Sequence, residues 1–210
     1  MLSEAITVEQ IDMSYAGIET VQSNSGPHAE LATAVITVAF STDPIARWVY
    51  PQADDYLRDF PAFIRVFAGR SFENGTAYLA PSASGAALWL PPGVGPDDDR
   101  MIDLIWSTTT EEIQKDLFPF LEQMGMFHPE EPHWYLPMIG VETHMQGRGI
   151  GASLMQHALA VCDEEGLPAY LESSNPRNVP MYERFGFEVI GTIQAGSSPP
   201  MYPMYRNAQR

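Results

Sequence analysis

The sequence predicts an α/β fold, and three of its features support this. Short apolar runs alternate along the chain with stretches in which apolar residues recur at helical spacing. In residues 133–151 a glycine-rich loop joins an apolar strand to a helix, and Pro137 lies inside that strand, where its missing N–H favours a bulge or an edge. The chain has 210 residues, 45% of them hydrophobic, so we expect one domain over residues 1–210.

The first half of the chain is predicted to alternate between helices and short strands. Four large aromatic or aliphatic residues, Phe60, Phe63, Ile64 and Phe67, form an apolar stripe that we expect to be core. The expected elements are a strand and polar loop in 1–27 (with Ile6, Val8, Ile11, Met13 and Tyr15 alternating), a helix in 28–40, a loop in 43–51 with Trp48 and Tyr50, a helix in 54–72, a hairpin of 75–80 with 85–90, and a helical stretch in 101–124 broken at 108–110 or at Pro119.

The second half is predicted to continue the alternation around the glycine-rich loop. Gly166 is a good helix end, and Pro180 suits the first turn of a short helix. The expected elements are a strand in 133–141, a helix in 150–165, a strand in 168–173, a loop and short helix in 174–186, a strand in 187–193, and a last edge strand in 201–205.

Composition excludes several classes of protein. The net charge of −16 argues against nucleic acid as a partner and is compatible with a cationic amine substrate. No apolar run is long enough to span a membrane, and residues 1–14 lack the pattern of a signal peptide. The single cysteine, Cys162, is expected to be inert core, which suits a cytoplasmic protein, and the histidines show no metal-ligand spacing, so we expect no metal.

The glycine-rich loop, residues 146–151, predicts an anion site. Its three alternating glycines let the backbone turn sharply and approach a ligand closely. The loop opens onto a helix whose free N–H groups and dipole favour a phosphate or pyrophosphate, and Arg148 adds a positive charge. The spacing departs from the dinucleotide-binding fingerprint, and the P-loop ending is absent, but ATP or NAD stays an alternative ligand.

Two motifs resemble the GNAT superfamily of N-acetyltransferases. Gln-x-x-Gly-x-Gly at 146–151 resembles the family's acyl-coenzyme-A loop, and the segment 178–187 resembles the asparagine–tyrosine–glycine-phenylalanine segment after the fifth strand. The last 75 or so residues are particularly similar to puromycin N-acetyltransferase and its bacterial relatives. The shared elements are HW, Gly-Val, QGRGIG, LESSNPRN and YERFGF.

The resemblance implies a mixed, mostly antiparallel central sheet with helices on both faces and a splay between strands four and five. Acetyl-coenzyme A would enter that splay, held by residues 133–210, with residues 1–132 on the substrate side. It further implies an acyl-CoA-dependent N-acyltransferase, monomeric or homodimeric, that moves an acetyl group to a primary amine of a small molecule by direct attack in a ternary complex. These motifs do not indicate which amine is the acceptor.

The resemblance also implies which residues bind the cosubstrate. They come from the fourth strand, the glycine-rich loop and the segment after the fifth strand. The implied cofactor-binding residues are Ile139, Gly140, Val141, Gln146, Gly147, Arg148, Gly149, Ile150, Gly151, Ala152, Asn175, Asn178 and Tyr182.

The chemistry of acetyl transfer needs a proton donor for the leaving thiolate, a donor for the oxyanion and a neutral amine. By resemblance Tyr182 is the general acid, one helical turn after Asn178. We expect the N–H of Met138 or Ile139 to point at the thioester oxygen. Glu172 is the candidate base.

The sequence leaves two alternatives about function, one for the identity of the base and one for whether the protein is an enzyme. His133 and Tyr135 compete with Glu172 for the role of base. A non-catalytic coenzyme-A-binding sensor on the same fold is the alternative to an enzyme, and only catalysis would need the Tyr182 hydroxyl.

Overall fold

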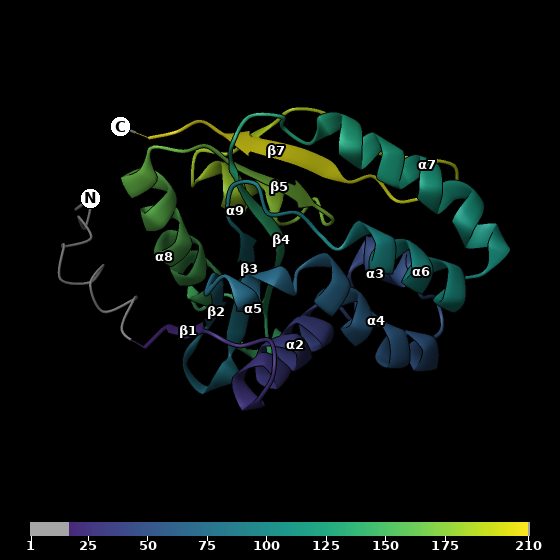
Figure 1. The fold of residues 1–210 in the computed structure, drawn as a ribbon, viewed down its shortest axis with the longest axis horizontal. Coiled ribbons are helices and arrows are strands. Elements are labelled where there is room, and N and C mark those ends of the chain that lie inside the picture. Colours follow the sequence, from purple (N-terminus) through teal and green to yellow (C-terminus); the bar gives the residue numbers. More distant parts are fainter. Residues whose placement is uncertain (1–16, 210) are drawn as a thin grey trace, which may run out of the picture.

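A computed structural model of the chain describes residues 17–209. The strand predicted within residues 6–15 lies outside the described residues. The described part forms one twisted sheet flanked by helices (Figure 1). In spatial order the strands are β1 (Glu19–Val21), β2 (Ala77–Leu79), β3 (Gly85–Leu90), β4 (Trp134–Val141), β5 (Ala169–Ser173), β7 (Tyr202–Arg206) and β6 (Glu188–Val189).

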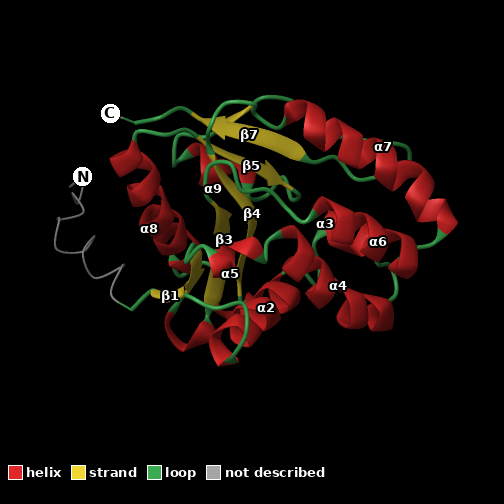
Figure 2. Ribbon diagram, in the orientation of Figure 1, coloured by secondary structure: helices red, strands yellow, loops and turns green. Residues whose placement is uncertain are grey.

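Helices cover both faces of the sheet (Figure 2). One core joins the sheet to α2, α4, α6 and α7, and a second core joins the opposite face to α8 and α9. The helices are α2 (Pro27–Ala39), α3 (Pro44–Val49), α4 (Ala53–Phe67), α5 (Arg70–Glu73), α6 (Asp98–Thr108), α7 (Glu111–Phe127), α8 (Ile150–Glu165) and α9 (Val179–Glu183), with short 3-10 turns at Pro81–Ala83 and Thr143–Met145. None of the described helices is long and apolar enough to cross a membrane.

The predicted splay between the fourth and fifth strands is confirmed. All neighbouring strands are antiparallel except β4 and β5, which are parallel and pair only over Trp134–Leu136 with Ala169–Leu171. Beyond Leu136, β4 continues to Val141 with β3 as its partner while β5 continues with β7. The two strands therefore separate and leave one edge of β4 unpaired by β5.

Pro137 lies at the point where the strands separate. Leu88 and Leu90 of β3 pair with Met138 and Tyr135, so β4 carries one extra residue there, which is a β-bulge. A proline has no N–H to give to a ladder, and the bulge is where the ladder is already interrupted. Of the two positions predicted for Pro137, a bulge or an edge, the structure shows the bulge.

Most predicted helices are confirmed, including the break at Thr109–Thr110 between α6 and α7, and two details are wrong. Residues 44–49 form helix α3 instead of a loop, because Pro44 suits the first turn and the Asp43 carboxylate accepts hydrogen bonds from the N–H groups of Ile45 (3.0 Å) and Ala46 (3.1 Å). The predicted helix over 54–72 is interrupted after Phe67 and resumes as the short α5.

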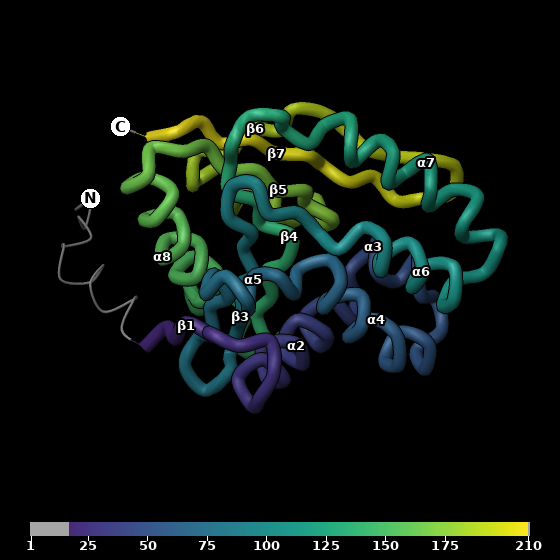
Figure 3. Tube along the Cα trace, viewed as in Figure 1, coloured from purple at the N-terminus to yellow at the C-terminus, as the bar shows by residue number. Residues whose placement is uncertain are grey.

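The last strand is not at the edge of the sheet as predicted. Figure 3 shows the yellow C-terminal strand β7 beside β5, and the register places it between β5 and β6. The strand predicted over 187–193 is shorter, with ladder pairing at Glu188–Val189 and one isolated bridge from Ile193 to Met201.

An ion pair with a buried guanidinium and a partly exposed carboxylate fixes this end of the sheet to α8. The guanidinium of Arg206 in β7 donates to both carboxylate oxygens of Asp163 (2.6 and 2.9 Å) and to the carbonyl oxygen of Phe185 (2.8 Å). The Arg206 side chain is 6% exposed and that of Asp163 is 38% exposed. Removing the carboxylate would leave a buried charge with a carbonyl oxygen as its remaining partner.

We therefore expect Asp163→Ala to lower the free energy of unfolding by about 2 kcal/mol, because a buried cation loses its counter-charge. Urea unfolding followed by circular dichroism measures the change. Glu164→Ala, at the exposed next position of the same helix, is the matched control and should leave stability within about 0.5 kcal/mol of the native chain. Equal stability of the two variants would contradict the role of the pair.

Candidate active site

One cavity of about 660 Å³ occupies the gap between β4 and β5 and extends under the N-terminal helices. Its lining comes from α2, α3, α4, α6 and α7 on one side and from β4, the glycine-rich loop, β5 and α9 on the other. All the predicted cofactor-binding residues line it except Arg148, which is exposed on the loop and outside the lining. Of the predicted catalytic residues, Met138, Ile139, Glu172 and Tyr182 line it as well.

The unpaired edge of β4 presents backbone groups to this cavity. Glu142 N–H donates to the Ser84 carbonyl oxygen (3.0 Å), and in an antiparallel ladder the hydrogen-bonded pairs alternate. With the observed register, the amides of Gly140 and Met138 face β3, whereas those of Ile139 and Val141 face the gap. The register therefore favours Ile139 over Met138 as a donor into the cavity. The Val141 carbonyl oxygen accepts from Gln146 Nε2 (3.1 Å).

The glycine-rich loop is shaped to expose the N-terminus of α8. Gly147 and Gly149 have φ values of +74° and +83°, a conformation that favours glycine. Gly149 is the residue before the helix and supplies no side-chain cap, so the first N–H groups of α8, from Ile150 to Ala152, lack intrahelical partners. These groups lie at the cavity, and with the helix dipole they suit an anion such as a diphosphate.

Tyr182 projects from α9 into the same cavity. The side chain is buried, and its ring packs edge-on against Phe187 at 6.3 Å. Burial raises the pKa of the Tyr182 hydroxyl well above its usual value, and the nearby Asp43 carboxylate raises it further. The hydroxyl thus stays protonated at neutral pH and can act as a proton donor. Asn178, just before α9, lines the cavity with it.

Glu172 is the acidic group of β5 that faces the cavity. Burial raises the pKa of its carboxyl to about 7, against partial opposition from the neighbouring Tyr135 and Tyr170 hydroxyls. Glu172 Oε1 and Tyr170 Oη are both buried without a hydrogen-bond partner. Unpartnered buried oxygens are rare in folded proteins, and a carboxyl with a pKa near 7 can exchange a proton at neutral pH.

The two competing candidates for the base do not line the cavity. His133 Nδ1 lies 2.7 Å from the Glu131 carbonyl oxygen, and its Nε2 lies 3.2 Å from His128 Nε2. Burial, together with His133, lowers the pKa of His128 to about 4. Tyr135 is buried next to Glu172, and burial raises the pKa of its hydroxyl.

Sequence reasoning missed a contact that ties the two halves of the cavity together. Ser174 Oγ, after β5, donates to Asp43 Oδ2 at the start of α3 (2.6 Å). Burial raises the pKa of Asp43, although the Ser174 hydroxyl and the amides of Ile45 and Ala46 oppose the shift. The Asp43-Pro44 pair is a helix-start pattern and could have indicated α3, which we predict as a loop, but it does not indicate the contact with Ser174.

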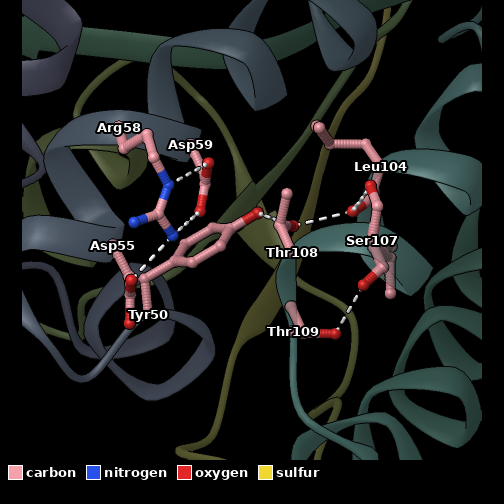
Figure 4. Close-up of polar contacts among 9 residues, drawn as sticks. Tyr50, Asp55, Arg58, Asp59, Leu104, Ser107, Thr108 and Thr109 are labelled. Carbon is pink, nitrogen blue, oxygen red and sulfur yellow. Dashed lines mark hydrogen bonds and ion pairs between the residues drawn. The ribbon is translucent and has the colours of Figure 1, made fainter.

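Tyr50, one of the two loop aromatics, belongs to the cavity wall. Its hydroxyl lies 3.1 Å from Thr108 Oγ1 at the end of α6, and Thr108 Oγ1 donates to the Leu104 carbonyl oxygen (2.7 Å) (Figure 4). Beside it, Arg58 on α4 pairs with Asp59 at 2.8 Å. The contact between Tyr50 and Thr108 joins the end of α3 to α6, whereas the Arg58–Asp59 pair lies within α4. The other aromatic, Trp48, does not line the cavity and donates to Ser197 Oγ (3.1 Å).

The remaining sequence expectations concern metals and Cys162. In residues 17–209 no three His, Cys, Asp or Glu side chains are grouped so that they could hold a metal ion. Cys162 is fully buried in the core between α8 and the sheet, and burial raises the pKa of its thiol to about 12. A thiol in this state is not a nucleophile.

Comparison with known proteins finds a family that matches part of the chain. Residues 103–187 match the family described as "Acetyltransferase (GNAT) family". The chain carries a GNAT acetyltransferase domain. GNAT acetyltransferases use acetyl-CoA, so this chain is an acyl-CoA-dependent acyltransferase with acetyl-CoA as its cosubstrate. The family assignment favours coenzyme A over the alternative of ATP or NAD.

One relative in sequence and two solved structures resemble the chain. An uncharacterized N-acetyltransferase of Schizosaccharomyces pombe is 29% identical over 176 residues, which are 74% of this chain and 69% of that protein. The solved "histone acetyltransferase HPA2 and related acetyltransferase" of Corynebacterium glutamicum has a TM-score of 0.63 at 22% identity, covering 92% of this chain and 97% of that one. A solved agmatine N-acetyltransferase has a TM-score of 0.61 at 12% identity, covering 90% and 97%. At such identities the two structures show the fold alone.

The glycine-rich loop gives a direct test of cosubstrate binding. We expect Gly149→Ala to weaken acetyl-CoA binding at least about tenfold, because a side chain at φ +83° strains the turn that presents the amides of α8. Isothermal titration calorimetry measures the dissociation constant. Gly166→Ala, with φ +65° at the other end of the same helix and outside the cavity, carries the same kind of strain and should bind normally. Equal weakening in both variants would mean that strain alone is responsible.

Proposed function

We propose that the chain is an N-acetyltransferase that moves an acetyl group from acetyl-CoA to a primary amine of a small molecule by direct attack. One observation carries the proposal: Glu172, Tyr182, the free edge of β4 and the glycine-rich loop all line one cavity. The name of the agmatine N-acetyltransferase, a structural neighbour, is consistent with an amine acceptor.

The proposed binding mode follows from the backbone groups at the cavity. Residues 133–210 hold the cosubstrate: the amides of Ile150 to Ala152 bind its diphosphate, and the edge of β4 from Ile139 to Val141 pairs with the amides of its arm. Asn175, Asn178 and Gln146 line the same path. Arg148 lies outside the cavity lining and would act through its charge at the mouth of the site. Residues 1–132 supply most of the acceptor wall.

The proposed chemistry assigns one step to each group. An alkylammonium has a pKa near 10, as lysine does, and must lose a proton before it can attack. Glu172 accepts that proton, and the neutral nitrogen forms a bond to the thioester carbonyl carbon. The gap-facing N–H of Ile139 stabilises the negative charge that develops on the carbonyl oxygen. As the carbon–sulfur bond breaks, the Tyr182 hydroxyl donates a proton to the sulfur. The acylated nitrogen loses its second proton to give the neutral amide, and a proton returned to Tyr182 through solvent restores its hydroxyl.

The rival proposal is a coenzyme-A-binding sensor without turnover. Both proposals need the loop and the free strand edge, but only the enzyme needs proton transfer at Tyr182. The oligomeric state, monomer or homodimer, and the cytoplasmic location stay predictions from the sequence.

We expect Tyr182→Phe to lower kcat at least about a hundredfold, because the leaving sulfur loses its proton donor. The dissociation constant of acetyl-CoA should stay within about twofold of the native value, because the ring is retained. Stopped-flow release of coenzyme A and calorimetry measure the two quantities. Tyr205→Phe, whose hydroxyl bonds to Glu131 Oε1 (2.9 Å) outside the cavity, is the control. Unchanged kcat in Tyr182→Phe would remove Tyr182 from the mechanism.

The raised pKa of Glu172 predicts how activity depends on pH. Below a pH of about 7 the carboxyl is protonated and cannot accept the proton of the amine, so kcat/KM should fall there with an inflection near 7. Glu172→Gln should lose this inflection together with most of the activity. An unaltered inflection in Glu172→Gln would assign it to another group.

The same pKa predicts a stability effect that needs no substrate. The folded-state pKa of about 7 lies above the ordinary value of 4.5, so the native chain loses stability as pH rises through this window. Glu172→Gln carries no such charge. From pH 5 to pH 8 the melting temperature of Glu172→Gln should therefore rise relative to that of the native chain. Scanning calorimetry measures this difference. Parallel pH profiles for the two proteins would contradict the burial of the Glu172 charge.

A further inference from the structure

We propose that the acceptor end of the cavity selects a primary monoamine with an apolar body, aromatic or aliphatic, and rejects amines that carry a second charge. The inference rests on the proposed function of the same cavity. It concerns which amines can place their nitrogen at Glu172.

A row of stacked aromatic rings on α4 forms one wall of the acceptor end. The rings of Phe60 and Phe63 lie 5.8 Å apart at 25°, and those of Phe63 and Phe67 lie 5.2 Å apart at 18°. Phe40 extends the row, with its ring 5.8 Å from that of Phe60. All four line the cavity. The stripe on α4 that the sequence predicts to be core is therefore also a ligand-facing surface.

The opposing wall is aliphatic and aromatic as well. It is contributed mainly by α7, with one residue of α6 and one that precedes β7. Its members are Ile105, Leu117, Phe120, Leu121, Met124 and Met201. Trp48 supports this wall from behind, with its ring 5.7 Å from that of Phe120. A flat or branched apolar group between these walls would be enclosed on two sides, which is how most small-molecule sites bind the body of a ligand.

Charge is confined to one end of this space. Among the described lining residues contributed by positions 39–124, Asp43 is the one charged side chain. Its carboxylate already accepts hydrogen bonds from Ser174 Oγ and from the amides of Ile45 and Ala46. Arg177 and Arg184 line the cavity from the segment around α9, beside the glycine-rich loop. Glu172 is the other lining carboxylate, on the β5 side of the cavity, and we take it as the partner of the ammonium group. Its Oε1 is buried without a hydrogen-bond partner.

One available carboxylate can pair with one ammonium group. A second ammonium, or a carboxylate on the same amine, would have to leave water and lie against the aromatic or aliphatic wall without a partner, which is strongly unfavourable. The net charge of −16 attracts monoamines and polyamines alike, so the discrimination comes from the cavity and not from the long-range field.

Matched pairs of amines test the inference. The first pair is 2-phenylethylamine and phenylalanine, which differ by a carboxylate, and the second is pentylamine and 1,5-diaminopentane, which differ by a second amine. We expect the singly charged member of each pair to bind at least about a hundredfold more tightly to the chain saturated with coenzyme A, as measured by calorimetry. Values of kcat/KM with acetyl-CoA should follow the same order. Equal or tighter binding of the diamine or of phenylalanine would overturn the inference.

A charge introduced into the wall should reverse the preference. In Phe63→Glu a second carboxylate faces the cavity, so binding of 1,5-diaminopentane relative to pentylamine should increase at least about tenfold. Met126→Glu places the same charge on α7 at a side chain that is 83% exposed and outside the lining, and should leave the ratio unchanged. Leu121→Glu, on the opposing wall, repeats the test if Phe63→Glu does not fold. An unchanged ratio in a folded wall variant would overturn the inference.

The outcomes also separate this inference from the proposed function. If the apolar monoamines bind selectively and no amine is acetylated, the acceptor pocket stands and the proposed reaction fails. If all four amines are acetylated with similar kcat/KM, the reaction stands and the selectivity fails.

Discussion

The interrupted pairing between β4 and β5 is the constraint on which the rest of the site depends. A buried strand normally satisfies both rows of its backbone groups, and a row left without a partner is unfavourable. Here the ladder between β4 and β5 ends at Leu136, next to the bulge at Pro137. Beyond it, the amides of Ile139 and Val141 face a cavity instead of a strand. The fold therefore keeps a place in the sheet for an extended ligand, and the glycine-rich loop and α9 lie along the same opening.

The electrostatics of the cavity differ from those of the molecule as a whole. An anionic cosubstrate approaches a chain of net charge −16, so its binding depends on short-range donors, chiefly the amides at the start of α8. Tyr182 is buried and Glu172 is partly buried, and desolvation raises the pKa of each. The same desolvation thus gives one group that can accept a proton near neutral pH and another that keeps its proton.

The parts of the site that could be predicted from the sequence are those encoded locally. The glycine-rich loop, the helix after it and the bulge at Pro137 each follow from the backbone preferences of a few adjacent residues. Helix α3 was missed because six residues are too few to show a period, and its capping residue, Asp43, lies with Pro44 in a segment that we predict to be a loop. The position of β7 was missed because strand order depends on pairings between distant segments.

The apolar walls of the acceptor end could not be predicted from the sequence, for a different reason. An apolar stripe such as Phe60, Phe63 and Phe67 has the same pattern whether it packs against other side chains or faces a cavity. Only the placement of α7 opposite α4 distinguishes the two. Likewise, nothing near Ser174 in the sequence indicates that it bonds to Asp43, which is 131 residues away.

The burial of Cys162 has a practical consequence for assays. The chain has one cysteine, which is inaccessible to solvent, and its thiol pKa is about 12. Reagents such as disulfides that react with thiolates should therefore leave the native protein untouched while they titrate the free coenzyme A that each turnover releases. Turnover can be followed continuously by colour in this way, with no background signal from the catalyst itself.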